Sequence, residues 1–246
     1  MLTDLQRSVV RLMLWLTDRF ETGDVVEPWM VLTALVLIAV TLAVPAFWRI
    51  VRNVVTIVHE MGHVVMAQLC GRRISGIKVH SDTSGLAITR GNPRGLGVLL
   101  TALAGYPAPA LVGVVMIWAA IAGHAGAALL VLLLVLALAW LLVRNVWGGL
   151  VVTGSLLGAG WIFWHNDPSA VTALVLVLGL FLVTGSVRAA FDLTLSHVRG
   201  TAVNSDAVTA RANSLVPVTF WLGFYLTVTG AAALVGLGMS VLALSS

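Results

Sequence analysis

The chain has 246 residues, of which 59% are hydrophobic and only 10% charged, and its mean hydropathy is +1.02. A soluble domain carries about 25% charged residues. The few charged side chains of this sequence could not cover the surface of a globule so rich in Leu, Val and Ala. The composition therefore excludes a water-soluble globule and predicts a protein embedded in the lipid bilayer.

The basic character of the chain does not indicate a nucleic-acid partner. The formal net charge is +4 and the isoelectric point is about 10.2, but the Lys and Arg residues are scattered between apolar runs instead of gathered with aromatic residues on one face. We therefore predict no nucleic-acid binding and interpret the basic residues as topology signals. The single cysteine, Cys70, excludes an internal disulfide.

The apolar runs predict an all-α integral membrane protein, because about 20 apolar residues can cross the hydrocarbon core as a helix. About seven such spans are expected, at residues 29–48, 51–70, 96–119, 125–143, 146–164, 170–191 and 217–242. The fourth and fifth spans are separated only by Arg144 and Asn145, so they form either a tight hairpin or a region with a re-entrant piece. The chain divides into an N-terminal segment, 1–26, and a polytopic membrane domain, 27–246, with a cytoplasmic loop at about 193–214.

The distribution of Lys and Arg predicts that the N-terminus is cytoplasmic in a multi-pass protein of the cell membrane. In that orientation 12 of the 14 basic residues lie on the inner side, and only Arg49 and Arg52 lie on the outer side. Segment 1–26 is predicted to be an interfacial amphipathic helix, with a disordered tail as the alternative. It does not resemble a signal peptide, because its apolar stretch is short and is followed by charged residues.

The polar region between the second and third spans predicts a β-hairpin, at about 73–91. Apolar residues alternate with polar ones on both sides of a turn-rich centre, Ser81-Asp82-Thr83-Ser84-Gly85. We expect this hairpin on the cytoplasmic side, where an edge could pair with an extended peptide by strand addition. A purely structural loop is the alternative.

The second span contains a His-Glu-x-x-His motif, His59-Glu60-Met61-Gly62-His63. On a helix, His59 and His63 lie one turn apart on the same face, so both can bind one Zn²⁺ with Glu60 beside the open coordination position. Zinc lowers the pKa of a bound water to about 7, and Glu60 could take its proton. Ionisable residues inside a span are costly and indicate function, although histidines satisfied by neighbouring helices are the alternative.

A catalytic zinc usually has a third protein ligand. Asp192 is the first choice, because its position at the end of the sixth span matches the depth of His63. Its alternative role is an ion pair with Arg188, four residues earlier. Asp206 is the rival ligand, although a carboxylate there would also suit the N-terminus of a short helix.

Two asparagines are candidates for contacts with substrate. Asn145 could donate a hydrogen bond to the oxyanion of a tetrahedral intermediate, or it could cap the turn between the fourth and fifth spans. Asn53 lies on roughly the same helix face as Glu60 and could hold a substrate strand or a water, or it could join helices. In the third span, Pro107 and Pro109 are expected to break the helix, which suits either the wall of an active site or a packing kink.

Together these motifs resemble the site-2 protease family of intramembrane zinc metallopeptidases, and its B-like branch in particular. The resemblance rests on the histidine motif inside a span and on four further stretches: Gly71-Arg72-Arg73 before the hairpin, Ala104-Gly105-Tyr106-Pro107-Ala108-Pro109, Arg144-Asn145-Val146-Trp147-Gly148 and Asn204-Ser205-Asp206-Ala207. It implies that His59 and His63 are zinc ligands and that Glu60 is the base. Many members carry an acidic third ligand after the asparagine, whereas this chain has Val151, Val152 and Thr153 there.

The sequence therefore predicts a zinc metalloendopeptidase with one Zn²⁺ per chain, which hydrolyses peptide bonds in or near transmembrane segments of membrane proteins. Its expected partners are a substrate helix and the lipid bilayer. The alternatives are a non-catalytic membrane scaffold, or degenerate peptidase homologue, and a metal transporter. The transporter is the weaker alternative, because the sequence offers no second metal cluster inside the membrane.

Overall fold

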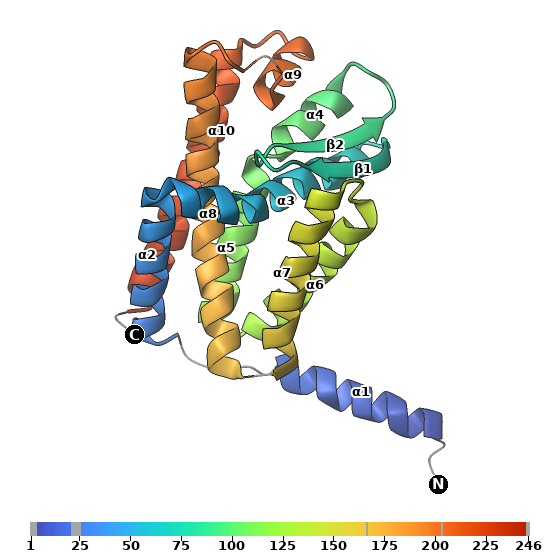
Figure 1. Ribbon diagram of the computed structural model, residues 1–246, viewed down its shortest axis with the longest axis vertical. Helices are drawn as coiled ribbons and strands as arrows, with labels where there is room; N and C mark the ends of the chain where they lie inside the picture. The colour runs from blue at the N-terminus through green and yellow to red at the C-terminus, as the bar shows by residue number, and fades with distance from the viewer. Residues whose placement is uncertain (1–3, 21–25, 166, 203, 245–246) are drawn as a thin grey trace.

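The computed structural model describes residues 4–20, 26–165, 167–202 and 204–244. Within these ranges the chain is mostly helical, with one two-stranded antiparallel sheet (Figure 1). The elements are α1 (Asp4–Phe20), α2 (Pro28–Ala43), α3 (Pro45–Leu69), β1 (Arg73–Val79), β2 (Gly85–Arg90), α4 (Leu96–Ala104), α5 (Pro107–Ile121), α6 (Ala125–Leu142), α7 (Val146–His165), α8 (Pro168–Val198), α9 (Asp206–Ala212) and α10 (Val218–Leu242).

Two pairs of helices are bent, and this lowers the number of spans below the predicted seven. Pro45 has no backbone N–H to continue a helix, and α3 turns by 109° from α2 and runs across the bundle (Figure 1). Likewise α5 bends by 50° from α4, next to Pro107. Among the described residues, four helices are long and apolar enough to cross a membrane, or up to six if each bent pair is one span.

The N-terminal helix and the hairpin lie at opposite ends of the bundle (Figure 1). Helix α1 contacts α6, whereas the hairpin lies beside α4 and the α6–α7 turn at the other end. The expectation that both are cytoplasmic therefore does not fit the fold. The bend at Pro45 accounts for this if α2 and α3 form one broken span, where two spans were predicted.

The hairpin forms over Arg73–Val79 and Gly85–Arg90, close to the predicted range. The strands pair antiparallel with Ile77 opposite Ala87, and the register shifts between Ile74 and Gly76. The second edge of β1 is also occupied, because Ile77 forms a parallel bridge with Val143 and accepts a hydrogen bond of 2.9 Å from the Arg144 amide. The hairpin is thus fixed to the α6–α7 turn through β1, and β2 is its outer strand.

Both asparagine candidates have structural hydrogen bonds. The Asn145 amide donates to the Val79 carbonyl at 2.6 Å and accepts from the Val79 N–H at 3.2 Å. The Asn53 amide donates to the Ile50 carbonyl at 2.9 Å and accepts from the Trp147 indole at 3.3 Å. Asn145 therefore fixes β1 to the α6–α7 turn and Asn53 joins α3 to α7, which replaces the predicted contacts of these side chains with substrate or oxyanion.

The main hydrophobic core lies where α5 packs against α8, and α2 and α10 flank this pair. The α5–α8 contact is close because glycines face each other. A Cβ on Gly113 would lie 2.6 Å from the Gly179 carbonyl oxygen. Small residues let helices in a membrane approach closely, so this pair gives a rigid support for the polar site at the hairpin end.

Candidate metal centre

Helix α3 carries both histidines of the motif on the face that looks into a cavity. The Nε2 atoms of His59 and His63 are 3.0 Å apart. The Nδ1 atom of His63 lies 2.7 Å from the Thr101 carbonyl oxygen. Because a carbonyl can only accept, Nδ1 carries the proton and a neutral His63 presents an unprotonated Nε2. A histidine held in this way by its other nitrogen is typical of metal ligands.

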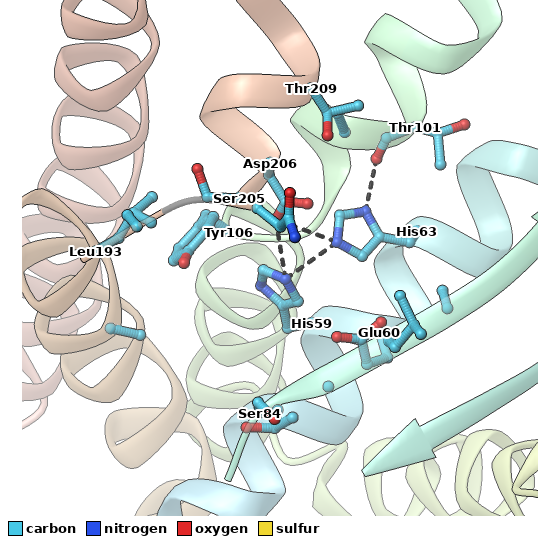
Figure 2. Close-up of a pocket in the computed structure, with 18 of the residues that line it drawn as sticks. His59, Glu60, His63, Ser84, Thr101, Tyr106, Leu193, Ser205, Asp206 and Thr209 are labelled. Carbon is cyan, nitrogen blue, oxygen red and sulfur yellow. Dashed lines mark hydrogen bonds and ion pairs between the residues drawn. The ribbon is translucent and has the colours of Figure 1, made fainter. Parts of the chain in front are cut away.

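Asp206 completes the group from the first turn of α9. Its Oδ2 lies 3.2 Å from His59 Nε2 and 3.3 Å from His63 Nε2, and the side chain points at both rings (Figure 2). Burial acts to raise the pKa of Asp206, but its contacts with the two imidazoles outweigh burial and hold that pKa below its usual range. These contacts lower the pKa while the imidazoles carry a proton; a metal ion would supply the positive charge in their place, and a carboxyl that binds a metal must be ionised.

Asp192, the first choice from the sequence, lies in a different place. Its Oδ2 is 3.8 Å from Arg52 Nη1, so its ion-pair partner is this arginine, seven residues before His59 on α3. Arg188, the alternative partner of Asp192, instead donates to the Leu42 carbonyl and stacks on the Trp48 ring. The depth of Asp192 along α8 does not predict its distance from His63, because α3 runs across the bundle and not along it.

The three atoms contributed by His59, His63 and Asp206 fit a zinc ion. Their separations are 3.0, 3.2 and 3.3 Å, whereas tetrahedral coordination at about 2.0–2.1 Å places ligand atoms roughly 3.3 Å apart. An unprotonated imidazole nitrogen facing a carboxylate oxygen is repulsive unless a cation or a proton lies between them. The donor set of two nitrogens and one oxygen is one that Zn²⁺ accepts.

Glu60 lies beside this group, buried on α3. One ligand atom each of His59, Glu60 and His63 lie within 4.8 Å of one another, so these three could also hold a metal. Glu60 Oε2 is buried and has no hydrogen-bond partner in the described part of the chain. Gly85 covers the carboxylate so closely that a Cβ there would collide with it. An unpartnered buried oxygen is costly in a passive side chain, which favours a functional role for Glu60.

The break between α4 and α5 forms one wall of the site. At Gly62 of α3, a Cβ would lie 2.5 Å from the Ala108 Cβ and 2.8 Å from the Ala104 carbonyl oxygen. Tyr106 in the break packs edge-on against His59, with 4.7 Å between ring centroids. The predicted effect of the prolines is therefore found as a bend, and it brings backbone and an aromatic ring against the histidines.

A cavity of about 590 Å³ contains the site. Residues of α3, β2, α4, α8 and α9 line it, so parts of the chain far apart in sequence meet there (Figure 2). The lining includes Ser84, Leu86 and Thr89 of the hairpin, which places β2 alongside the histidines. Strand β2 and the candidate metal-binding residues thus line the same cavity.

Comparison with known protein families decides the membership of the chain. A model of the peptidase M50B-like family matches residues 32–236, a range that includes His59, Glu60, His63 and Asp206. The chain belongs to the peptidase M50B-like family. This confirms the predicted resemblance to the B-like branch of the site-2 proteases, and M50 members are zinc-dependent peptidases. Neither a curated protein nor a solved structure matches the chain.

Sequence reasoning did not assign roles to three groups at this site. The Thr101 carbonyl has no side-chain signature, so no pattern could have found it. In the sequence, Gly85 is placed only in the turn-rich centre of the hairpin, although it is also the first residue of β2. Tyr106 was noticed only as part of a helix break, and an aromatic residue in a break beside a histidine motif was the available signal.

Gly105 gives a first test of the wall. A Cβ at this position would lie 2.5 Å from two atoms of the His63 ring and 2.6 Å from the His59 ring. We expect Gly105→Ala to displace the imidazoles and to lower zinc affinity by about 10–100-fold, as for other residues that orient metal ligands. Isothermal titration with Zn²⁺ measures this. Gly158→Ala is the control, because no heavy atom lies within 4 Å of its Cβ position; equal affinity in both variants would contradict the arrangement.

Proposed function

We propose that the protein is an intramembrane zinc metalloendopeptidase that hydrolyses peptide bonds in or near transmembrane segments of membrane proteins. The observation that carries this proposal is the convergence of His59, His63 and Asp206 beside the buried carboxylate of Glu60, whose Oε2 has no hydrogen-bond partner among the described residues. The family supports it, since M50 members are zinc-dependent peptidases.

In this proposal His59, His63 and Asp206 hold one Zn²⁺. Asp206 is the third ligand, in place of Asp192, which was the first choice from the sequence. A bound zinc ion would supply an activated water and an electrophilic centre for the substrate carbonyl. Glu60 removes the proton of the attacking water and passes it to the leaving amine. The Thr101 carbonyl keeps His63 in the tautomer that its role requires.

Strand β2 is the proposed docking edge for the substrate backbone. Its partner β1 is paired on both sides, whereas residues of β2 line the cavity next to Glu60. An extended peptide could add to this edge by main-chain hydrogen bonds. A helical substrate segment would have to unwind locally to bind there, because a helix uses its own backbone groups internally.

We further propose that the hairpin end of the bundle faces the cytoplasm. Arg72, Arg73, Arg90 and Arg94 flank the hairpin, and Arg144 lies in the adjacent turn, as the positive-inside rule expects of a cytoplasmic face. With the bend at Pro45 counted as part of one crossing, α1 then lies on the opposite side. Peptide cleavage would take place near the cytoplasmic surface.

Cleavage by the purified full-length chain tests the proposal without a known substrate. The zinc-loaded protein is reconstituted into vesicles with a pool of solubilised membrane proteins, and new N-termini are labelled and sequenced. We expect new N-termini in or beside transmembrane segments, lost on addition of the chelator 1,10-phenanthroline and restored by excess Zn²⁺. A protein that binds one zinc per chain and generates no new N-termini would instead be a membrane scaffold.

A further inference from the structure

A second cavity, of about 390 Å³, adjoins the metal centre and has no part in the roles assigned so far. Tyr106 and Leu193 line both this cavity and the larger one, so the two are neighbours. The second cavity contains three charged side chains, Arg52, Asp192 and Arg199. Charged groups grouped at a cavity in a membrane protein indicate a polar ligand.

Arg52 is the charged residue that lines both cavities. Its contact with Asp192 joins one nitrogen to one oxygen at 3.8 Å, which is longer than the roughly 2.7–2.9 Å of a tight charge-assisted hydrogen bond. Both side chains are about one-third exposed, at 33% and 35%. The guanidinium also lies 5.9 Å from the Trp48 ring centroid. Arg52 is therefore held in place but keeps donors free for another carboxylate.

Arg72, the other arginine of the large cavity, is held differently. Its guanidinium donates to the Asn92 carbonyl at 2.6 Å and to the Thr89 hydroxyl at 3.1 Å. These bonds tie the residue before β1 to the end of β2 and to the loop that follows it. Both terminal nitrogens of Arg72 are thus bound within the fold, whereas the guanidinium of Arg52 makes no hydrogen bond within the described ranges.

The position of Arg52 relative to the metal centre sets which part of a substrate it can reach. Arg52 precedes His59 by seven residues on the same face of α3, which is about 10 Å along the helix axis. An extended peptide covers roughly 3.3 Å per residue, so that distance corresponds to about three residues. The hairpin turn follows the same course up to the start of β2, because the Thr56 hydroxyl donates to the carbonyl of Thr83 in the turn and Gly85, the first residue of β2, covers Glu60.

We infer that Arg52 is a specificity-determining residue that selects an acidic side chain about three residues to one side of the scissile bond, and that Asp192 occupies Arg52 when no substrate is bound. The inference rests on the proposed peptidase function and names its substrate class: peptide segments with a carboxylate at that distance. The incoming carboxylate replaces Asp192 on the guanidinium. Asp192 and the substrate carboxylate thus compete for the Arg52 guanidinium.

The test uses the zinc-loaded full-length protein in detergent and a library of quenched fluorescent peptides, in which Asp, Gln or Lys is placed at each position around a fixed centre. Cleavage sites are read by mass spectrometry, and kcat/KM is measured for matched Asp and Gln peptides. We expect about a tenfold preference for Asp over Gln at one position, three residues from the cleaved bond, in the range of a single charge-assisted contact. No positional preference for Asp would overturn the inference.

Four variants separate recognition from a structural role. Arg52→Gln should lose the preference for Asp over Gln peptides, and Arg52→Lys should retain part of it. Arg52→Glu should favour Lys at the same position, a reversal that loss of structure cannot produce. Arg49→Gln is the matched control, because Arg49 is an exposed arginine on the same helix that lines neither cavity. An Asp preference that survives in Arg52→Gln would overturn the inference.

Asp192→Asn and a binding measurement complete the design. Removing the competing carboxylate should raise the affinity for Asp peptides several-fold and leave that for Gln peptides unchanged. Fluorescence anisotropy measures peptide binding without cleavage. If wild type cleaves no peptide, the proposed function fails, and the anisotropy of Asp and Gln peptides with wild type and Arg52→Gln still decides the role of Arg52. Equal affinities in all four combinations would refute it.

Discussion

The Asp206→Asn variant is expected to lose its zinc, with a fall in affinity of more than about 100-fold. Substitution of a residue that only orients a metal ligand lowers metal affinity by about 10–100-fold. A larger loss is expected at Asp206, because its Oδ2 lies within 3.3 Å of both histidine nitrogens. The substitution keeps the size of the side chain but removes the negative charge that balances the cation. Elemental analysis of the purified protein, together with titration of the metal-free form, measures the loss.

Asp192→Asn is the matched control for this experiment, because it makes the same chemical change on α8. Its carboxylate contacts Arg52, so the variant should keep one zinc per chain. Circular dichroism and thermal unfolding of both variants check that α9 has not simply come loose. Zinc retained in Asp206→Asn and lost in Asp192→Asn would return the third ligand to the end of α8.

The contrast between the two aspartates shows how far the sequence could go. The histidine pair follows from a spacing of four residues on one helix, and such local geometry is fixed by the helical repeat. The proposed third ligand, Asp206, reaches the histidines because α9 packs back over α4, and no local pattern contains that contact. Matching depths along two spans assumed upright helices, and the 109° bend before α3 breaks that assumption.

The bend itself had a signal in the sequence. Pro45 lies inside the run predicted as the first span, and proline removes a helical hydrogen bond. Pro107 and Pro109 predict a break in the third span in the same way, and the structure has the expected bend there. Around Pro45 the continuous apolar run 29–48 predicts one unbroken span. The structure shows instead a 16-residue helix, α2, followed by a long helix across the bundle.

The asparagines illustrate a different limit. A polar side chain near a catalytic motif can serve either substrate or backbone, and the sequence does not distinguish these roles. Asn145 uses both ends of its amide on Val79, which satisfies a strand edge that would otherwise lie unpaired in an apolar setting. Because buried backbone groups need partners, the packing of the hairpin on the α6–α7 turn gives Asn145 a structural role.

The Glu60→Gln variant is expected to keep its zinc and to lose cleavage. A general base contributes about 10²–10⁴-fold to a rate, so the cleavage rate should fall by at least about 100-fold. Glutamine has nearly the same shape, and it fits under Gly85 as glutamate does. It cannot accept the proton of the attacking water, although both histidines and Asp206 remain in place. Cleavage assays and zinc analysis on the same preparation measure the two effects together.

This variant also decides between the two groups of side chains that could hold a metal. If His59, Glu60 and His63 were the ligand set, which their spacing permits, Glu60→Gln would lose zinc as well as activity. If Asp206 completes the set, zinc stays bound and only the proton transfer fails. Glu27→Gln is the control, because Glu27 is exposed before α2 and its side chain makes no capping bond. Full cleavage by Glu60→Gln would rule out Glu60 as the base, since no amide can take over that proton.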